Sequence, residues 1–200
     1  MASIRDQVFR RLRAKGRGTV FGPSDFLDLG SRAAVDQALS RLARSGKIRR
    51  LARGVYDYPK THPHFGALSP SLDRVAAAIA RATGSTIQLS GAHAANLLGL
   101  STQIPAHLVY LTDGPPRKVR VGNQMIEFRH AAPRKLAGAG TPAGTVLQAL
   151  QYLGRAGMTD DLVRRLQRTL DPADKASLRR HARSAAAWAR PAITQIAEAG

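Results

Sequence analysis

The stretch that decides the fold runs from residue 30 to residue 59 and reads GSRAAVDQALSRLARSGKIRRLARGVYDYP. Ser31 is a typical helix cap, and Gly46 is placed to end the helix that Ser31 begins. Between them, apolar residues recur at the helical spacing i, i+3, i+4 and i+7, at Val35, Ala38, Leu39 and Leu42. This pattern predicts a helix over 31–45 with one buried face.

The second part of the stretch, residues 45–58, predicts a tight and strongly basic β-hairpin. Gly54 supplies the left-handed conformation that a two-residue turn requires, with Arg53 beside it at the tip. The first strand is less regular, because Ile48 and Leu51 are three residues apart and cannot share a face of a regular strand. We therefore expect a β-bulge there, or a strand buried partly on both sides.

The residues before this stretch complete a recognisable order of elements. Apolar spacing predicts a helix over 3–15, a short strand-like run over 18–22 and a short helix over 23–29. Helix, strand, helix, tight turn, helix and basic hairpin is the order of a winged helix-turn-helix, in which the last helix reads the DNA major groove. We assign residues 1–60 to such a domain.

The exposed face of the 31–45 helix carries side chains that suit base recognition. Arginine can bridge guanine O6 and N7, glutamine can pair with adenine, and alanine can contact the thymine methyl group. The helix N-terminus and the basic hairpin are suited to phosphate. We predict that DNA is bound by Ser31, Arg32, Ala33, Gln37, Ser40, Arg41 and Arg44 of the helix and by Lys47, Arg49, Arg50 and Arg53 of the hairpin. The alternative is that these are ordinary solvated charges.

Residues 61–200 predict a second domain of mixed strands and helices. A segment rich in proline around 59–70 marks the boundary, and a helix follows it over 71–84. Short strands then predominate up to residue 130, with Gly122–Asn123 as the two-residue turn of a hairpin.

The C-terminal part predicts helices. We interpret 131–144 as a loop and expect helices from about residue 145, with Thr159 and Asp171 as caps and Pro191 breaking or kinking the last one. The predicted fold class is α+β: a winged helix-turn-helix, then a mixed α/β domain with a helical end.

The composition favours a polyanionic partner. The 200 residues include 31 Lys and Arg against 13 Asp and Glu, for a formal net charge of +18. Nucleic acid fits this charge best, although an anionic membrane surface would also fit. Cysteine is absent, so disulfides and cysteine-based zinc sites are excluded. We find no signal peptide and no apolar window long enough for a membrane span, and we expect a cytoplasmic protein.

Signals for an enzyme are weak. His62 and His64 lie in a proline-rich segment with too few partners for a metal site. The glycine-rich run 138–144 does not have the spacing or the Lys–Ser/Thr ending of a phosphate-binding loop. We therefore expect no catalysis, no cofactor and no metal. The C-terminal arginines remain open between solvated helix faces and an extended contact surface, and Trp188 between a packing anchor and an interface residue.

Two segments resemble a known family. The stretch 30–59, together with LSPSLDRVAAAIARATGSTIQLSGAHAANLLGLSTQIPAHLVYLTDGPPRKVRVG at 68–122, is similar to AbiEi-type antitoxins and related bacterial winged-helix regulators. The resemblance covers roughly residues 1–155. It implies that the winged helix binds inverted repeats in its own promoter and represses it. It also implies that the second domain is associated with neutralising a nucleotidyltransferase-like toxin.

The resemblance leaves a second interpretation of the function open. Some relatives are plain regulators, so the chain is alternatively a stand-alone winged-helix transcriptional regulator whose second domain dimerises or senses a ligand. A monomer binding two repeats and a homodimer matching their two-fold symmetry are both compatible with the sequence.

Overall fold

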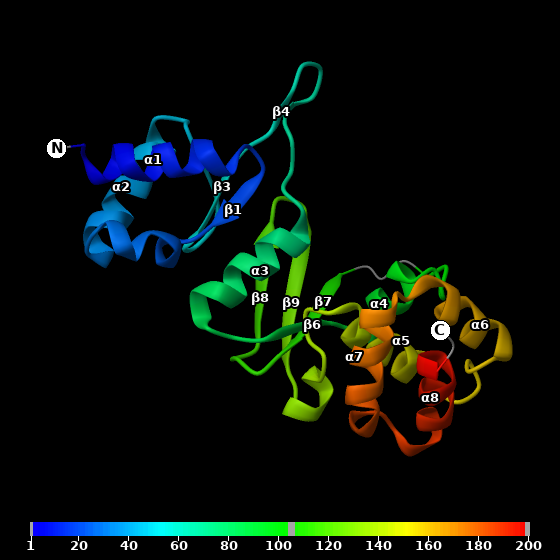
Figure 1. The fold of residues 1–200 in the computed structure, drawn as a ribbon. Helices are drawn as coiled ribbons and strands as arrows, with labels where there is room; N and C mark the ends of the chain where they lie inside the picture. The colour runs from blue at the N-terminus through cyan, green and yellow to red at the C-terminus, as the bar shows by residue number, and fades with distance from the viewer. Residues whose placement is uncertain (1, 104–106, 199–200) are drawn as a thin grey trace. The chain divides into compact units, whose positions relative to one another are not determined.

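The computed structural model describes residues 2–103 and 107–198, which fall into two compact units. The first unit comprises Met1–Ser85 and Val119–Ile126, and the second comprises Thr86–Lys118 and Glu127–Gly200. N-terminal helices with a small sheet, a four-stranded sheet and a helical C-terminal part make up an α+β fold (Figure 1), which confirms the predicted fold class. No helix in the described residues is both long and apolar enough to span a bilayer.

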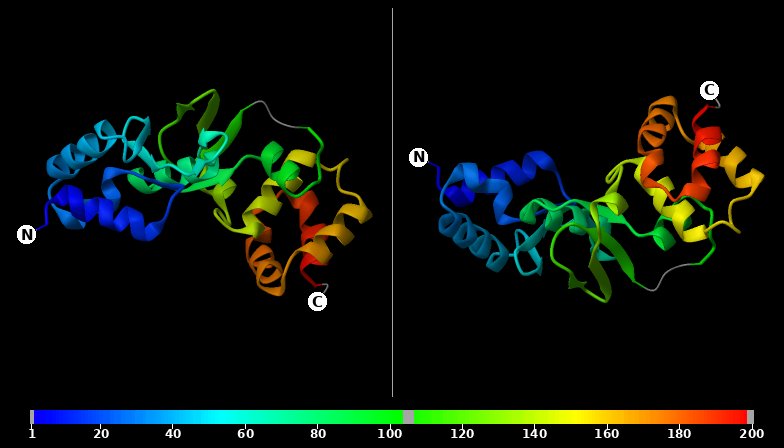
Figure 2. Two further views of the ribbon diagram at one scale, coloured as in Figure 1. Left: turned by 90° about the horizontal axis from the view of Figure 1, so that it is seen from above. Right: turned by 90° about the horizontal axis from the view of Figure 1, so that it is seen from below.

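The first unit begins with the elements of a winged helix-turn-helix in the predicted order. They are α1 (Ile4–Lys15), β1 (Thr19–Phe21), η1 (Pro23–Leu29), α2 (Arg32–Arg44), β2 (Arg49–Ala52) and β3 (Val55–Tyr58). The three strands form an antiparallel sheet in the order β1-β3-β2, and α1 and α2 pack side by side (Figure 2). The predicted short helix at 23–29 is present as a 3₁₀ helix.

The core of the winged helix lies between its helices and one face of the sheet. The rings of Phe21 and Phe26 meet edge to face at 5.6 Å, and Tyr56 stacks on Phe21 at 6.2 Å. The predicted apolar face of α2 is buried at Val35, Ala38, Leu39 and Leu42, and all but Ala38 belong to this cluster. Burial of this face is what fixes the opposite face of α2 toward solvent.

The hairpin has both predicted features. The register of β2 against β3 shifts between Arg50 and Ala52, which is the expected bulge. Gly54 has a φ of +73°, the left-handed conformation that favours glycine, in the two-residue turn.

A third helix covers the other face of the sheet. α3 (Leu72–Thr83) packs on β1, β3 and η1, where Val20 and Val55 are buried. Arg74 Nη1 donates to the Gly18 carbonyl at 3.1 Å, and Arg81 Nη2 donates to the Val20 carbonyl at 3.2 Å. The boundary that we predicted after residue 60 therefore falls inside the first unit. Its proline-rich segment instead contains a small hairpin, β4 (Thr61–His62) with β5 (Gly66–Ala67).

The four-stranded sheet has the order β6-β7-β9-β8. Its strands are β6 (Ile87–Leu89), β7 (Leu108–Thr112), β8 (Arg117–Val121) and β9 (Gln124–His130). Gly122 has a φ of +60° in the two-residue turn between β8 and β9, as the sequence predicts.

The helices of the second unit enclose a core of their own. They are α4 (Gly91–Leu97), η2 (Pro133–Leu136), α5 (Pro142–Leu153), α6 (Asp160–Thr169), α7 (Pro172–His181), η3 (Ala182–Ser184), η4 (Ala187–Ala189) and α8 (Arg190–Glu198). The core is apolar and includes Val146, Leu150, Leu166, Ile193 and Ile196. Both predicted caps are in place, since Thr159 and Asp171 accept hydrogen bonds from the first turns of α6 and α7.

Two predictions about the C-terminal part were wrong. Pro191 lies in the first turn of α8 rather than breaking a helix, because the first turn has no intrahelical acceptor for the N–H that proline lacks. The segment 131–144, expected to be a loop, contains η2 and the start of α5. Thr141 Oγ1 caps α5 by accepting from the Gly144 N–H at 3.3 Å.

Candidate functional site

The solvent face of α2 holds the predicted base-reading residues. Ser40 is half-buried, and the others on this face are exposed: Arg32, Ala33, Gln37, Arg41 and Arg44. Ser31 is exposed at the N-cap, and its Oγ accepts from the Ala34 N–H at 3.3 Å. The cap therefore orients the first turn of α2, and the remaining free N–H groups of that turn point outward.

The arginines of α2 differ in their partners. Arg32 Nε donates to Asp36 Oδ2 at 3.0 Å, an exposed pair one turn apart on the same face. Arg41 and Arg44 make no side-chain hydrogen bond or ion pair with any residue that the structure describes. Their guanidinium groups have all five donors available, whereas Arg32 uses its Nε–H on Asp36 and keeps the four Nη N–H donors for a new acceptor.

The hairpin between β2 and β3 forms a short wing. Arg50 and Arg53 are exposed and have no side-chain partner among the described residues. The turn lies against the start of η1, because a Cβ placed on Gly22 would be only 3.1 Å from the Gly54 carbonyl oxygen. The wing is therefore a compact platform for these two cations, and its backbone does not extend far from the core.

Arg49 is in a different environment from the other wing cations. Its Nε donates to Asp57 Oδ1 at 3.1 Å and its Nη2 to Asp57 Oδ2 at 2.7 Å, which forms a bidentate ion pair. Asp57 is only 1% exposed, and the pKa of Arg49 is raised by this hydrogen-bonded carboxylate. Nη2 also donates to the Leu68 carbonyl at 2.7 Å. Arg49 therefore neutralises a buried charge, and we reassign it from phosphate contact to structural support.

A second group of cations gathers where β1 begins and β3 ends, around Gly18. A Cβ on Gly18 would lie 3.4 Å both from Arg74 Nη1 and from the Lys60 side chain. Arg17 lies over the Tyr58 ring at 4.9 Å, and Lys47 lies over the Phe9 ring at 4.8 Å. Phe9 and Tyr58 are themselves in edge-to-face contact at 5.9 Å.

We call this group, Arg17, Lys47, Lys60 and Arg74, the Gly18 cluster. Only Lys47 was predicted from the sequence, because the members are up to 57 residues apart and no local spacing connects them. Their common signal is indirect. Arg17 and Lys47 each lie over an aromatic ring, and Lys60 and Arg74 lie beside Gly18. Gly18 immediately precedes β1, a strand that the winged-helix order already predicted.

The first helix contributes less free charge than its sequence suggests. Arg11 donates to both carboxylate oxygens of Asp28, at 2.8 and 2.6 Å, which ties α1 to η1. This hydrogen-bonded guanidinium lowers the pKa of Asp28. Arg10 and Arg13 are exposed.

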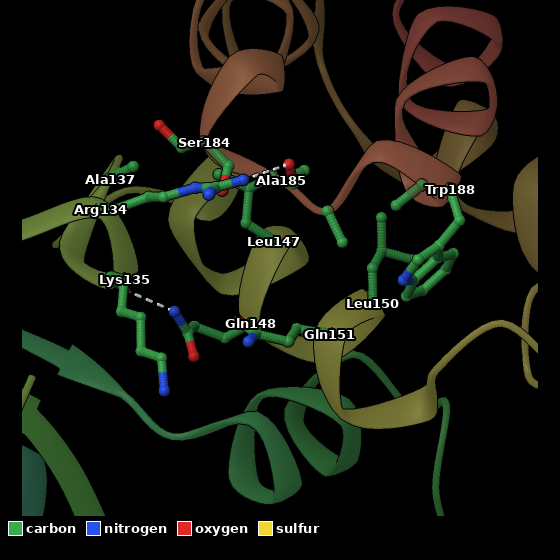
Figure 3. A pocket seen from close by; sticks show the side chains of 12 residues that line it. Arg134, Lys135, Ala137, Leu147, Gln148, Leu150, Gln151, Ser184, Ala185 and Trp188 are labelled. Carbon is green, nitrogen blue, oxygen red and sulfur yellow. Dashed lines mark hydrogen bonds between the residues drawn. The ribbon is translucent and has the colours of Figure 1, made fainter. Parts of the chain in front are cut away.

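The second unit contains a cavity of about 260 Å³ between η2, α5 and the segment 184–189 (Figure 3). Leu147, Leu150 and Trp188 form an apolar wall, while Arg134 and Lys135 lie on η2 at its edge. Arg134 fixes the geometry by donating from Nε and Nη2 to the carbonyls of residues 184 and 185, both at 3.0 Å.

One polar side chain of the cavity wall is almost fully buried. Gln148 is 6% exposed, and its Nε2 donates to the Lys135 carbonyl at 2.6 Å. No donor in the described chain reaches its Oε1. A small apolar cavity with a polar glutamine side chain in its wall and cations at its edge has the character of a small-molecule site.

Comparisons with known proteins identify a family. A family model described as a family of unknown function (DUF6088) matches residues 7–178. Among solved structures, the chain is similar to the crystal structure of the RV2827C protein from Mycobacterium tuberculosis, with 18% identity and a TM-score of 0.41. The alignment covers 98% of this chain and 76% of that one. No curated protein matches the chain.

Proposed function

The chain belongs to the DUF6088 family, and we propose that it is a winged-helix protein that binds double-stranded DNA and regulates transcription. The observation that carries this proposal is the solvent face of α2. It presents Arg41 and Arg44, which have no side-chain partner among residues 2–103 and 107–198, beside Gln37, on a helix whose other face is buried. Arg50 and Arg53 continue this unpaired charge onto the wing.

The proposed mechanism divides the contacts into two kinds. The α2 helix enters the major groove, where arginine reads guanine, Gln37 reads adenine and Ala33 contacts a thymine methyl. Arg50, Arg53 and Lys47 hold backbone phosphates and set the register of the protein on the duplex. Ser31 at the helix N-terminus adds N–H groups that favour a phosphate oxygen.

Gln37 provides a test of base reading that is separate from affinity. We expect Gln37→Ala to reduce the preference for the specific duplex over a scrambled one by about 1–3 kcal/mol, because one bidentate base contact is lost. Binding to the scrambled duplex should not change, since phosphate contacts dominate there. Competition anisotropy with both duplexes measures this. If Gln37→Ala loses the same affinity for the specific and the scrambled duplex, Gln37 does not read a base.

The finer form of the proposal is repression of the chain's own promoter by an antitoxin. It is supported by the resemblance of residues 30–59 and 68–122 to AbiEi-type antitoxins. Co-expression with a nucleotidyltransferase-like protein encoded next to this chain tests it. Relief of growth arrest would support the antitoxin role, and unrelieved arrest would reject it and leave a stand-alone regulator.

A second candidate function, ligand sensing by the second unit, is favoured by the cavity beside Trp188. Its apolar wall and two edge cations suit a small aromatic carboxylate. Trp188 is the single tryptophan of the chain, so its fluorescence reports on this cavity alone.

We expect benzoate to change Trp188 fluorescence saturably, with a Kd on the order of millimolar for so small a ligand. Lys135→Glu should weaken binding about tenfold, because it reverses one of the two edge charges. Benzamide, which is neutral and of the same shape, serves as the control. If benzoate and benzamide quench Trp188 fluorescence linearly, and equally in the natural chain and in Lys135→Glu, the cavity is not a binding site for the carboxylate.

A further inference from the structure

The β4–β5 hairpin is the most exposed element of the first unit. Its two strands pair at two positions, Thr61 with Ala67 and His62 with Gly66. The Leu68 N–H also donates to the Lys60 carbonyl at 2.8 Å. Apart from half-buried His62, every residue from 60 to 68 is exposed. Figure 1 shows the hairpin extending away from α1, α2 and the three-stranded sheet.

A hairpin this short is not stable by itself, so its position depends on contacts at its base. Arg17 Nη1 donates to the Pro59 carbonyl at 3.0 Å on one side, and Arg49 Nη2 donates to the Leu68 carbonyl at 2.7 Å on the other. Two arginines of the winged helix therefore fix both ends of the hairpin, and its tip is presented from a defined base.

The tip of the hairpin is aromatic. The rings of His62 and Phe65 lie 4.9 Å apart, and His62 Nδ1 accepts from the His64 N–H at 3.2 Å. Phe65 is nevertheless 78% exposed, the highest value among the exposed large apolar side chains of the described residues, which are Leu27, Phe65, Leu68, Leu97 and Tyr152. A tip that is ordered by its own contacts but leaves a phenyl ring in water is suited to contact with another molecule.

The charge around the hairpin indicates the class of that molecule. No acidic residue occurs between residues 58 and 72, while the Gly18 cluster supplies four cations around the hairpin base. The partner must therefore be anionic and must also accept a phenyl ring. DNA meets both requirements, because phosphates border a minor groove whose base steps admit apolar side chains.

The hairpin is also continuous with the surface already proposed for DNA. Lys47 belongs both to the Gly18 cluster and to the predicted phosphate contacts, and it lies three residues after the end of α2.

We propose that the β4–β5 hairpin is a second DNA-contacting arm, which inserts Phe65 into the minor groove beside the major-groove segment read by α2. This inference rests on the proposed DNA-binding function. The Gly18 cluster holds the phosphates between the two grooves, and Phe65 partly unstacks a base step, which bends the duplex. The arm extends the contacted DNA beyond the base pairs that α2 reaches.

The test compares Phe65→Ala with the natural chain on two duplexes, one carrying the site with long flanks and one trimmed to the base pairs that α2 covers. We expect Phe65→Ala to weaken binding to the long duplex about tenfold, as for the loss of one aromatic contact with a base. On the trimmed duplex the two proteins should bind equally. Leu97→Ala, which removes another strongly exposed apolar side chain (70% exposed), should bind like the natural chain on both.

A bend measurement adds an independent result. Fluorophores at the two ends of the long duplex should come closer when the natural chain binds, and this change should be reduced for Phe65→Ala. Lys60→Glu should lower the salt slope on the long duplex by about 0.9 or more, since one phosphate contact is lost.

The outcomes separate the arm from the winged helix. If the natural chain binds both duplexes and Phe65→Ala binds each duplex as tightly as the natural chain does, the arm proposal is overturned and the winged-helix proposal stands. If Phe65→Ala leaves DNA affinity unchanged but lowers self-association in sedimentation, the hairpin is a contact between copies, which also overturns the arm. If the natural chain binds neither duplex, the proposed function itself fails.

Discussion

Reversing Arg50 and Arg53 together to Glu is expected to lower DNA affinity by at least about 100-fold, because two phosphate contacts become two repulsions. The slope of log K against log salt should become shallower by about 1.8, or 0.9 for each lost contact. Both side chains are exposed and without a described protein partner, so the free energy of unfolding should stay the same. Fluorescence anisotropy and urea denaturation measure the two quantities.

The matched control is Arg179→Glu with Arg180→Glu, at an exposed pair of arginines on α7. This double variant lowers the net charge by the same amount. If both double variants lose affinity equally, overall charge rather than the wing governs binding. If neither loses affinity, the wing is a structural element and its assignment to phosphate is incorrect.

The second large effect concerns the ion pair under the wing. Arg49→Met should destabilise the fold by about 3 kcal/mol, because it leaves the Asp57 carboxylate buried without its cation. Adding Asp57→Val should restore most of this loss, since an apolar, β-branched side chain suits a buried strand position. Urea denaturation of Arg49→Met, of Asp57→Val and of the double variant measures the coupling between the two side chains. Additive losses would show that the two side chains do not act as a pair.

The restored double variant also decides the role of Arg49 in binding. With the fold intact, Arg49→Met with Asp57→Val should bind the trimmed duplex, which the β4–β5 hairpin does not contact, with the same salt slope as the natural chain. A slope shallower by about 0.9 would return Arg49 to the phosphate contacts that the sequence predicted.

The elements of the first unit were predictable because their signals are local. Ser31 and Gly46 mark the ends of α2, and its apolar spacing identifies the buried face. The three-residue gap between Ile48 and Leu51 predicted the bulge in β2 for the same reason. Spacing and capping act within a few residues, so a single sequence displays them directly.

The contacts that need tertiary structure were not predictable. Arg49 and Asp57 pair across two strands, and only their register shows that one wing cation is already neutralised. The Gly18 cluster is formed from residues that are far apart in sequence. The boundary after residue 60 was misplaced because a proline-rich segment resembles a linker, whereas here α3 returns to cover the sheet. The cavity beside Trp188 has no sequence motif of any kind.

The central claim is that the α2 face and the wing bind duplex DNA with sequence preference. The most direct test is the affinity of the natural chain for its own upstream region and for a scrambled duplex, measured by anisotropy between 50 and 200 mM salt. The three phosphate contacts of Lys47, Arg50 and Arg53 predict a slope of about −2.7 or steeper, together with tighter binding to the upstream region at every salt concentration. No binding, a slope near zero, or equal affinity for both duplexes would contradict the account.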